Sequence, residues 1–215
     1  MFDWKSIETV LLDMDGTLLD LHFDNYFWQE YLPECWANKN GMDLDAAKQS
    51  LEPELKKMTG TLSWYCLDFW SQHLNIDILE LKNDLIDMIV PRPRAIDFLE
   101  HIGGMQKTVI MVTNAHQKLI DMKLDKTGIG IYFREIICAH DYGSPKEDLT
   151  FWNKLDAKLK INKQTTLLID DNQDVLNTAR KFGIKNLVTI ARPDSKAPVR
   201  EVNDYHAIHD FAELM

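Results

Sequence analysis

Short apolar runs recur along the chain and alternate with longer segments in which apolar residues are spaced three or four positions apart. The runs are apolar at consecutive positions and rich in valine and isoleucine, a pattern typical of strands covered on both faces. Five runs predict strands at 9–12, 108–112, 135–139, 165–169 and 186–190. The spaced segments predict helices at about 94–103, 115–127, 149–160 and 172–182.

This alternation of strands and helices predicts the class of fold. Consecutive parallel strands need a crossover connection, and a helix between them provides it with right-handed geometry. Gly128 and Gly183 follow two of the predicted helices, where glycine commonly ends a helix. We therefore expect an α/β protein with a Rossmann-like parallel sheet flanked by helices.

The stretch 20–90 departs from this rhythm because it contains no strand pattern. Its apolar spacing predicts helices at about 25–36, 43–58, 62–74 and 78–89. The sequence Pro91-Arg92-Pro93 then ends the helical stretch, since a residue before proline is pushed out of the helical region. We expect 1–19 and 91–215 to form the α/β core and 20–90 to form a helical cap inserted after the first strand.

Polar residues directly follow the strands predicted at 9–12, 108–112 and 165–169. Lys146 lies in the loop after the strand predicted at 135–139. Ligands of open parallel sheets bind beyond the carboxyl ends of the strands, so these side chains are expected to converge. The candidate site residues are Asp13, Asp15, Thr113, Asn114, Lys146, Asp170 and Asp171.

This set of side chains predicts a particular chemistry. Carboxylates that share one crevice repel each other and stay ionised together only around a cation. With oxygen ligands and no histidine or cysteine cluster, the expected ion is Mg²⁺. Lys146 and the Thr113 hydroxyl could then hold a phosphate, and a carboxylate could attack it. Asp15 is placed to give a proton to the leaving oxygen and later to take one from water.

Four segments in order along the chain resemble the four motifs of the haloacid dehalogenase (HAD) superfamily. The segment LDMDGTL at 12–18 resembles the first motif, and Thr113-Asn114 resembles the second. Lys146 resembles the third motif, and Ile169-Asp170-Asp171 resembles the acidic fourth. A single Asp-x-Asp is weak evidence, but four ordered motifs across nearly the whole chain are specific.

The resemblance implies a role for each of these residues. Asp13 is expected to be the nucleophile and a metal ligand. Asp15 is expected to be the general acid and base and to bind the metal through its backbone carbonyl. Thr113, Asn114 and Lys146 are expected to hold the phosphoryl group that is transferred.

The acidic fourth motif departs from the family pattern in one respect. The resemblance implies that Asp171 binds the metal and that Asp170 binds it directly or through water. Members of this family with a Gly-Asp fourth motif often carry a further aspartate four residues after the ligand, whereas this chain has Val175 there and Asp174 one residue earlier. Asp174 is therefore a weaker candidate ligand than Asp170 or Asp171.

Asp15 selects among the reactions of the family. Its dehalogenases lack this second carboxylate, because a halide leaves without a proton, and its phosphonate-cleaving members replace it with a small residue. A retained aspartate implies an alkoxide leaving group. We therefore expect hydrolysis of phosphate esters by a phosphoric monoester hydrolase.

The predicted cap is rich in aromatic residues that could stack on a purine base or only pack the cap internally. The stretches FDNYFW at 23–28, SWYCLDFW at 63–70 and PKED at 145–148 resemble the bacterial purine nucleotidases of this superfamily. This resemblance implies that purine nucleoside 5′-monophosphates such as GMP and IMP are hydrolysed. Sugar phosphates and other small phosphate esters remain alternative substrates.

Composition and charge restrict the partners. The chain has 24 basic and 34 acidic side chains, a formal charge of −10, which disfavours long nucleic acid and anionic membranes as partners. Three scattered cysteines and an N-terminus without a basic, apolar leader predict a cytoplasmic protein with reduced thiols. The oligomeric state is left open.

Two other classes of protein share some of these features. A two-component receiver domain also combines acidic residues, threonine and lysine around Mg²⁺, but there the acidic pair precedes the acceptor aspartate and no helical insertion is present. A catalytically inert binding or signalling member of the fold would also resemble this chain. Its complete set of candidate catalytic residues favours an enzyme, and a phosphatase assay separates the two.

Overall fold

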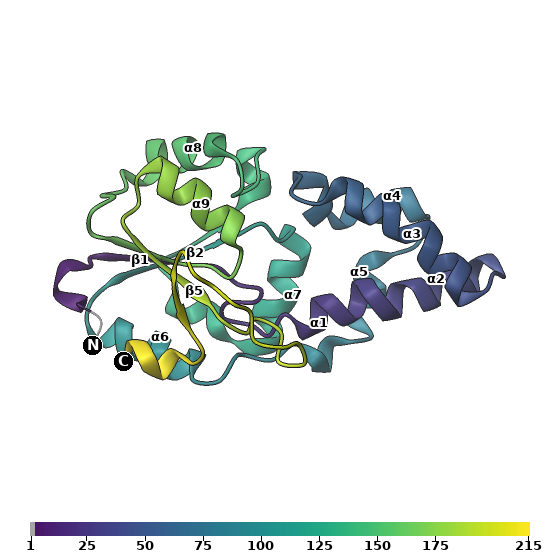
Figure 1. Ribbon diagram of the computed structural model, residues 1–215, viewed down its shortest axis with the longest axis horizontal. Helices are drawn as coiled ribbons and strands as arrows, with labels where there is room; N and C mark the ends of the chain where they lie inside the picture. Colours follow the sequence, from purple (N-terminus) through teal and green to yellow (C-terminus); the bar gives the residue numbers. More distant parts are fainter. Residues whose placement is uncertain (1–2) are drawn as a thin grey trace.

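A parallel sheet of six strands forms one end of the molecule in the computed structural model, which describes residues 3–215 (Figure 1). The strand order is β3-β2-β1-β4-β5-β6, and every neighbouring pair is parallel. The strands are β1 (Thr9–Leu12), β2 (Thr108–Thr113), β3 (Glu135–Cys138), β4 (Thr166–Ile169), β5 (Asn186–Ile190) and β6 (His206–Ile208). The predicted fold class is confirmed, and β6 is an edge strand that the sequence analysis missed.

Helices cover both faces of the sheet. Consecutive strand residues point to opposite faces, and here both faces carry apolar side chains that the helices bury. Val10 and Leu12 of β1 belong to one apolar core with α6 and α7, whereas Leu11 belongs to a second core with α8 and α9. These helices are α6 (Ala95–Gly104), α7 (Gln117–Thr127), α8 (Leu149–Leu159) and α9 (Gln173–Phe182). Gly128 and Gly183 end α7 and α9 in the left-handed conformation, as predicted.

A second lobe lies beside the carboxyl ends of the strands and consists of helices (Figure 1). A single π-helical stretch, Phe27–Tyr31, joins its first two helices, and the short 3-10 helix Leu62–Tyr65 precedes α4. Trp70 is fully buried among the side chains of this lobe. The helices are α1 (His22–Tyr26), α2 (Leu32–Asn40), α3 (Leu44–Met58), α4 (Leu67–Leu74) and α5 (Ile78–Asn83).

The chain leaves the sheet lobe and returns to it at one place. Leu19 and Pro91 form an isolated antiparallel bridge. The amide of Asp20 donates to the carbonyl of Val90 at 3.0 Å, and the amide of Arg92 donates to the carbonyl of Leu18 at 2.8 Å. The two connections between the lobes therefore run side by side.

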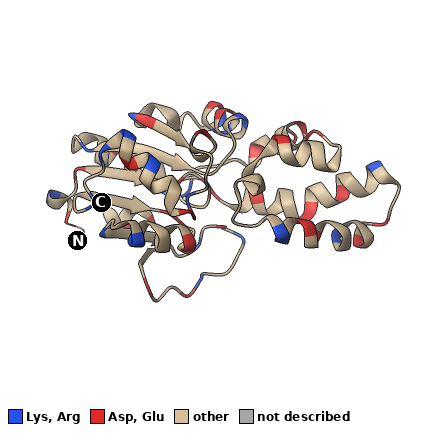
Figure 2. Cartoon of the chain, turned by 90° about the horizontal axis from the view of Figure 1, so that it is seen from above, with Lys and Arg blue, Asp and Glu red and all other residues tan. Residues whose placement is uncertain are grey.

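Acidic and basic residues are scattered over the helices of both lobes (Figure 2). The described cysteines Cys35, Cys66 and Cys138 are free thiols. Within residues 3–215, no helix combines the length and the apolar composition needed to cross a membrane.

Candidate active site

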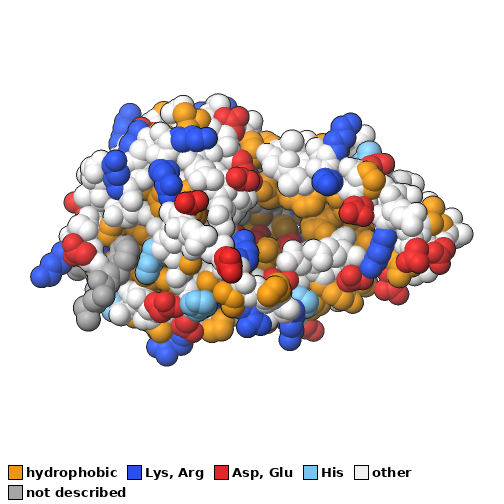
Figure 3. All heavy atoms as spheres, viewed as in Figure 1, with side chains coloured by type: hydrophobic (Ala, Val, Ile, Leu, Met, Phe, Trp, Pro, Cys, Tyr) orange, Lys and Arg blue, Asp and Glu red, His pale blue; other side chains and the backbone are white. Residues whose placement is uncertain are grey.

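A hollow opens between the two lobes (Figure 3) and contains a cavity of about 460 Å³. Its floor is formed by residues at the carboxyl ends of β1, β2 and β4, and its roof by side chains of the helical lobe. All seven residues predicted from the strand ends line this cavity: Asp13, Asp15, Thr113, Asn114, Lys146, Asp170 and Asp171. The cavity falls within the range of volumes typical of small-molecule sites.

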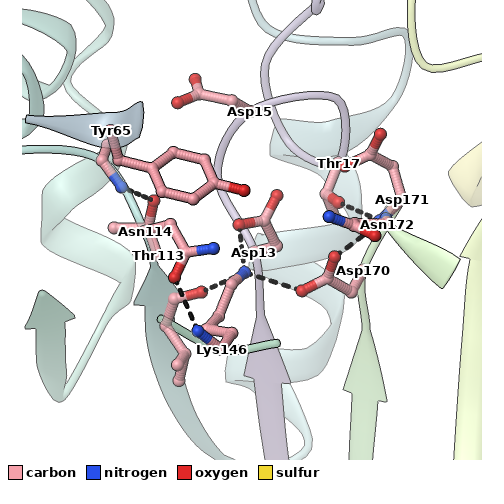
Figure 4. A network of polar contacts seen from close by, with 12 residues as sticks. Asp13, Asp15, Thr17, Tyr65, Thr113, Asn114, Lys146, Asp170, Asp171 and Asn172 are labelled. Carbon is pink, nitrogen blue, oxygen red and sulfur yellow. Dashed lines mark hydrogen bonds and ion pairs between the residues drawn. The ribbon is translucent and has the colours of Figure 1, made fainter. Parts of the chain in front are cut away.

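Lys146 lies at the centre of the floor (Figure 4). Its ammonium donates to Asp13 Oδ1 at 2.6 Å, to Asp170 Oδ2 at 2.7 Å and to the carbonyl of Val112 at 3.0 Å. Burial lowers the pKa of Lys146, but the charges of Asp13 and Asp170 outweigh burial and hold that pKa above its ordinary value. Lys146 is therefore a buried cation that joins the carboxylate after β1 to the carboxylate after β4.

Asp13, Asp170 and Asp171 each direct a carboxylate oxygen into one small space, where these oxygens lie within 4.8 Å of one another. Burial raises the pKa of Asp13 to about 6. Burial, together with the charges of Asp13 and Asp170, raises the pKa of Asp171 well above its usual range. A cation at this position would restore the ionised forms, and an all-oxygen set of donors suits a hard ion such as Mg²⁺.

The turn after β1 brings the backbone unusually close to this cluster. Gly16 has φ +80°, and a Cβ there would lie 2.6 Å from the carboxyl carbon of Asp171. Thr17 holds the backbone of Asp171, since its hydroxyl accepts from the backbone amide of Asp171 at 3.1 Å. The glycine is needed both for its backbone conformation and for this close approach.

The two residues after β2 serve the site in different ways. The Thr113 hydroxyl is buried and accepts from the amide of Ala115 at 3.1 Å. Both ends of the Asn114 amide are bonded within the protein, because Oδ1 accepts from the Lys146 amide at 2.9 Å and Nδ2 donates to Glu147 at 2.8 Å. The Asn114 side chain thus fixes the loop that carries Lys146.

Asp15 also lines the cavity, but its carboxylate points away from Asp13 (Figure 4) and lies outside the three-carboxylate cluster. Lys123 of α7 donates to Asp15 Oδ1 at 2.6 Å and to Asp24 Oδ2 of α1 at 2.6 Å. Burial raises the pKa of Asp15 to about 6, although Lys123 opposes this effect. Asp174, the weaker candidate ligand, is exposed at the cavity edge and outside the cluster.

Several residues of the site were missed in the sequence analysis. Glu147 accepts hydrogen bonds from Tyr65 of the helical lobe at 2.6 Å and from Asn172 at 3.1 Å, in addition to the bond from Asn114. Its position next to Lys146 in the sequence could have indicated that Glu147 belongs to the site. Lys123 lies three residues after Ile120 and four residues after Leu119, both of which are buried residues of the same helix. This spacing places Lys123 on the buried face of α7 and could have indicated its burial.

The comparisons with known proteins agree with this geometry. The family model described as haloacid dehalogenase-like hydrolase matches residues 7–183. Two curated relatives, each a GMP/IMP nucleotidase YrfG, come from Escherichia coli (strain K12) and Shigella flexneri. Each is 37% identical over 212 residues, which cover 99% of this chain and 96% of the relative.

Solved structures of similar fold include a HAD phosphatase from Thermococcus onnurineus, with a TM-score of 0.79 at 21% identity. An L-2-haloacid dehalogenase from Xanthobacter autotrophicus has a TM-score of 0.64 at 14% identity. In both comparisons 97% of this chain and 96% of the other chain are covered. The chain belongs to the haloacid dehalogenase-like hydrolase family. The predicted class of enzyme, a phosphoric monoester hydrolase, is confirmed.

The close approach at Gly16 gives a prediction with a matched control. Gly16→Ala should lower stability by ~1–3 kcal/mol through backbone strain, and by displacing Asp171 it should also lower kcat/KM by about 10²-fold. Gly60→Ala carries a similar strain, at φ +77°, but a Cβ there meets no atom within 4 Å. Thermal unfolding and phosphatase assays of both variants check this: equal kcat/KM in the two variants would contradict the role of the close approach.

Proposed function

We propose that this protein is a magnesium-dependent phosphatase that hydrolyses purine nucleoside 5′-monophosphates, GMP and IMP, through an aspartyl-phosphate on Asp13. The observation that carries the proposal is the buried cluster of Asp13, Asp170 and Asp171 beside Lys146, at the floor of a cavity of nucleotide size. The activity named for the two full-length relatives supports the choice of substrate.

The residues present fit a magnesium ion. Asp13, Asp170 and Asp171 would hold it with carboxylate oxygens, and Asp15 with its backbone carbonyl. Bound there, the ion supplies positive charge that neutralises the phosphate oxygens. Asp170 would bind the ion directly or through a water molecule, because its carboxylate also accepts from Lys146.

In the first step, an Asp13 carboxylate oxygen attacks phosphorus and the bond from phosphorus to the ester oxygen breaks. Asp15 gives its proton to the departing oxygen, so that the nucleoside leaves as a neutral alcohol. The raised pKa of Asp15, about 6, supports this role because a carboxyl must be protonated to act as an acid. Lys146 and the Thr113 hydroxyl offset the charge on the phosphoryl oxygens, with the Asn114 backbone beside them.

In the second step, Asp15 takes a proton from a water molecule, whose oxygen attacks the phosphorus of the aspartyl-phosphate. The bond between phosphorus and the Asp13 oxygen breaks, which releases inorganic phosphate and restores the Asp13 carboxylate. Asp15 ends the step protonated and ready for the next cycle. The two half-reactions therefore balance without any other proton carrier.

We further propose that 20–90 is a cap domain that closes over this site, with 1–19 and 91–215 as the core. Trp28 and Trp64 of the helical lobe line the cavity and stack on each other with centroids 5.6 Å apart. Trp64 also contacts the buried Trp70 edge-on, so the aromatic residues pack the lobe internally as well. A purine base can lie against the half-buried indole surface that remains in the cavity.

The substrate is tested by measuring phosphate release with Mg²⁺ from purine and pyrimidine nucleoside monophosphates and from sugar phosphates. We expect GMP and IMP to give kcat/KM values about tenfold or more above those of CMP, UMP and glucose 6-phosphate. A preference for sugar phosphates would favour the alternative, a HAD phosphatase of other small esters. No phosphate release from any ester would favour an inert binding member of the family.

We also infer a cytoplasmic location, from the three free cysteines, which suit a reducing compartment.

Asp15→Asn should affect substrates unequally. An amide cannot give a proton to the leaving oxygen, so kcat/KM should fall by about 10²-fold for phenyl phosphate, whose phenolate is a poor leaving group. The loss should be about tenfold smaller for p-nitrophenyl phosphate, whose leaving group needs little protonation. The value of kcat/KM reports steps up to aspartyl-phosphate formation, so the later step does not obscure the comparison. Equal losses on the two esters would contradict the acid role of Asp15.

A further inference from the structure

Four charged side chains of alternating sign form a row between the two lobes, in which the lysines are buried and the aspartates are partly buried. Lys123 Nζ lies 2.6 Å from both Asp15 Oδ1 and Asp24 Oδ2, and Lys82 Nζ lies 2.8 Å from Asp24 Oδ1. The two lysine side chains are each only 1% exposed. The two aspartates, Asp15 and Asp24, lie far along the sequence from the two lysines, Lys82 and Lys123. Only folding brings the lysines beside the aspartates.

These residues come from both sides of the cavity. Asp15 follows β1 and Lys123 lies on α7, both in the sheet lobe, whereas Asp24 lies on α1 and Lys82 on α5, both in the helical lobe. Lys82 also lies over the rings of Phe23 and Phe27, with its ammonium 4.8 and 4.1 Å from their centroids. Lys123 is therefore bonded at once to the candidate acid of the sheet lobe and to the first helix of the other lobe.

Holding the two lobes together does not by itself require a buried lysine between two carboxylates. The same helix α7 already carries two exposed ion pairs to the helical lobe, Lys118 with Asp68 and Lys126 with Asp87, each at 2.6 Å. Burying charges is costly, and breaking such a pair leaves an uncompensated buried charge, whereas apolar contacts could join the lobes without that cost. The distinguishing feature of Lys123 is its bond to Asp15, which lines the cavity.

We propose that Lys123 is a positioning residue that fixes the orientation of the Asp15 carboxyl, and that Asp24, supported by Lys82, makes this orientation depend on the docked helical lobe. With one oxygen held by Lys123, rotation of the Asp15 carboxyl is restricted. This inference rests on the proposed role of Asp15 as general acid. It predicts that loss of Lys123 impairs the proton transfer more than it impairs the other parts of the reaction.

The test uses the full-length protein with Mg²⁺ and the two aryl phosphates of the Asp15→Asn experiment. Lys123→Met should lower kcat/KM by about tenfold or more for phenyl phosphate and by less than about threefold for p-nitrophenyl phosphate. The matched control is Lys126→Met, on the same helix and facing the same lobe but bonded only to the exposed Asp87 in the described contacts. Both esters should keep values within about twofold of the wild type in this control.

A double variant separates a positioning role from a structural one. If Lys123 acts through Asp15, Lys123→Met should not change the ratio of the two kcat/KM values further in the Asp15→Asn background. A folded Lys123→Met protein with equal losses on both esters, or with an additional change of ratio in the double variant, would overturn the proposal. Circular dichroism and thermal unfolding establish that each variant is folded.

Asp24→Asn provides a second route if Lys123→Met does not fold. It keeps the Lys123–Asp15 bond but weakens the contact of the helical lobe with Lys123. The ratio of the kcat/KM values for the two esters should therefore change by about threefold, in the same direction as in Lys123→Met. An unchanged ratio would overturn the dependence on the helical lobe. If Asp15→Asn itself shows equal losses, the proposed acid fails. If Asp15→Asn is selective and Lys123→Met is not, only the positioning role fails.

Discussion

Asp13→Asn should reduce turnover by about 10³-fold or more, because an amide oxygen is a poor nucleophile and the covalent route is closed. The fold should survive the change. Burial raises the pKa of Asp13 to about 6, so a neutral side chain suits this position better than a charged one in the metal-free protein. Lys146 keeps its bonds to Asp170 and to the carbonyl of Val112. We therefore expect a melting temperature equal to or above that of the wild type.

The matched control for Asp13→Asn is Asp174→Asn, which alters an exposed carboxylate at the edge of the same cavity. This variant should keep kcat within about twofold, since surface substitutions that break no specific contact have small effects. Initial rates of phosphate release and thermal unfolding check both variants. If Asp13→Asn retained more than a few per cent of the wild-type kcat, the covalent mechanism would be wrong.

Removal of divalent metal should abolish turnover, and Mg²⁺ should restore it. The three carboxylates of the cluster lie within 4.8 Å of one another beside one lysine, so the phosphate dianion would meet uncompensated negative charge without the ion. We expect activity in excess EDTA to fall by about 10²-fold or more, since charge neutralisation is a principal part of phosphoryl transfer. Dialysis followed by Mg²⁺ titration measures the recovery.

Binding of the ion has a readout apart from activity. Mg²⁺ should raise the melting temperature of the wild type, because an ion that binds the folded state alone stabilises it. Asp171→Asn should remove most of this shift, whereas Asp174→Asn should keep it, since Asp174 lies outside the cluster. Full activity in EDTA, or an equal thermal shift in Asp171→Asn, would contradict the assigned metal site.

The central part of the fold follows from local sequence patterns. Strands β1, β2 and β4 are apolar at consecutive positions because helices cover both faces of the sheet, and this burial is what the pattern records. The edge strand β6 has three residues, His206–Ile208, and begins with an exposed histidine. Such a short edge strand is defined by its pairing with β5, which local patterns do not contain.

The floor of the site was predictable for a topological reason. Parallel strands place their carboxyl ends at one edge, so residues after β1, β2 and β4 must converge wherever the crossovers are regular. The roof was not predictable in this way. Lys82 and Lys123 were not among the residues predicted for the site, because a lysine in a sequence indicates a solvated surface unless its partners are known. Their partners Asp15 and Asp24 lie 58 to 108 positions away along the chain.

The central claim is that phosphate passes through Asp13, and a direct measurement is available. Wild-type protein with Mg²⁺ is mixed with excess GMP, quenched in acid within one turnover, digested and analysed by mass spectrometry. We expect one phosphoryl group on the peptide that contains Asp13, chemically labile to hydroxylamine as an acyl phosphate is, and none in Asp13→Asn. Rapid turnover of GMP with no phosphorylated peptide, or with the phosphoryl group on another residue, would contradict the account.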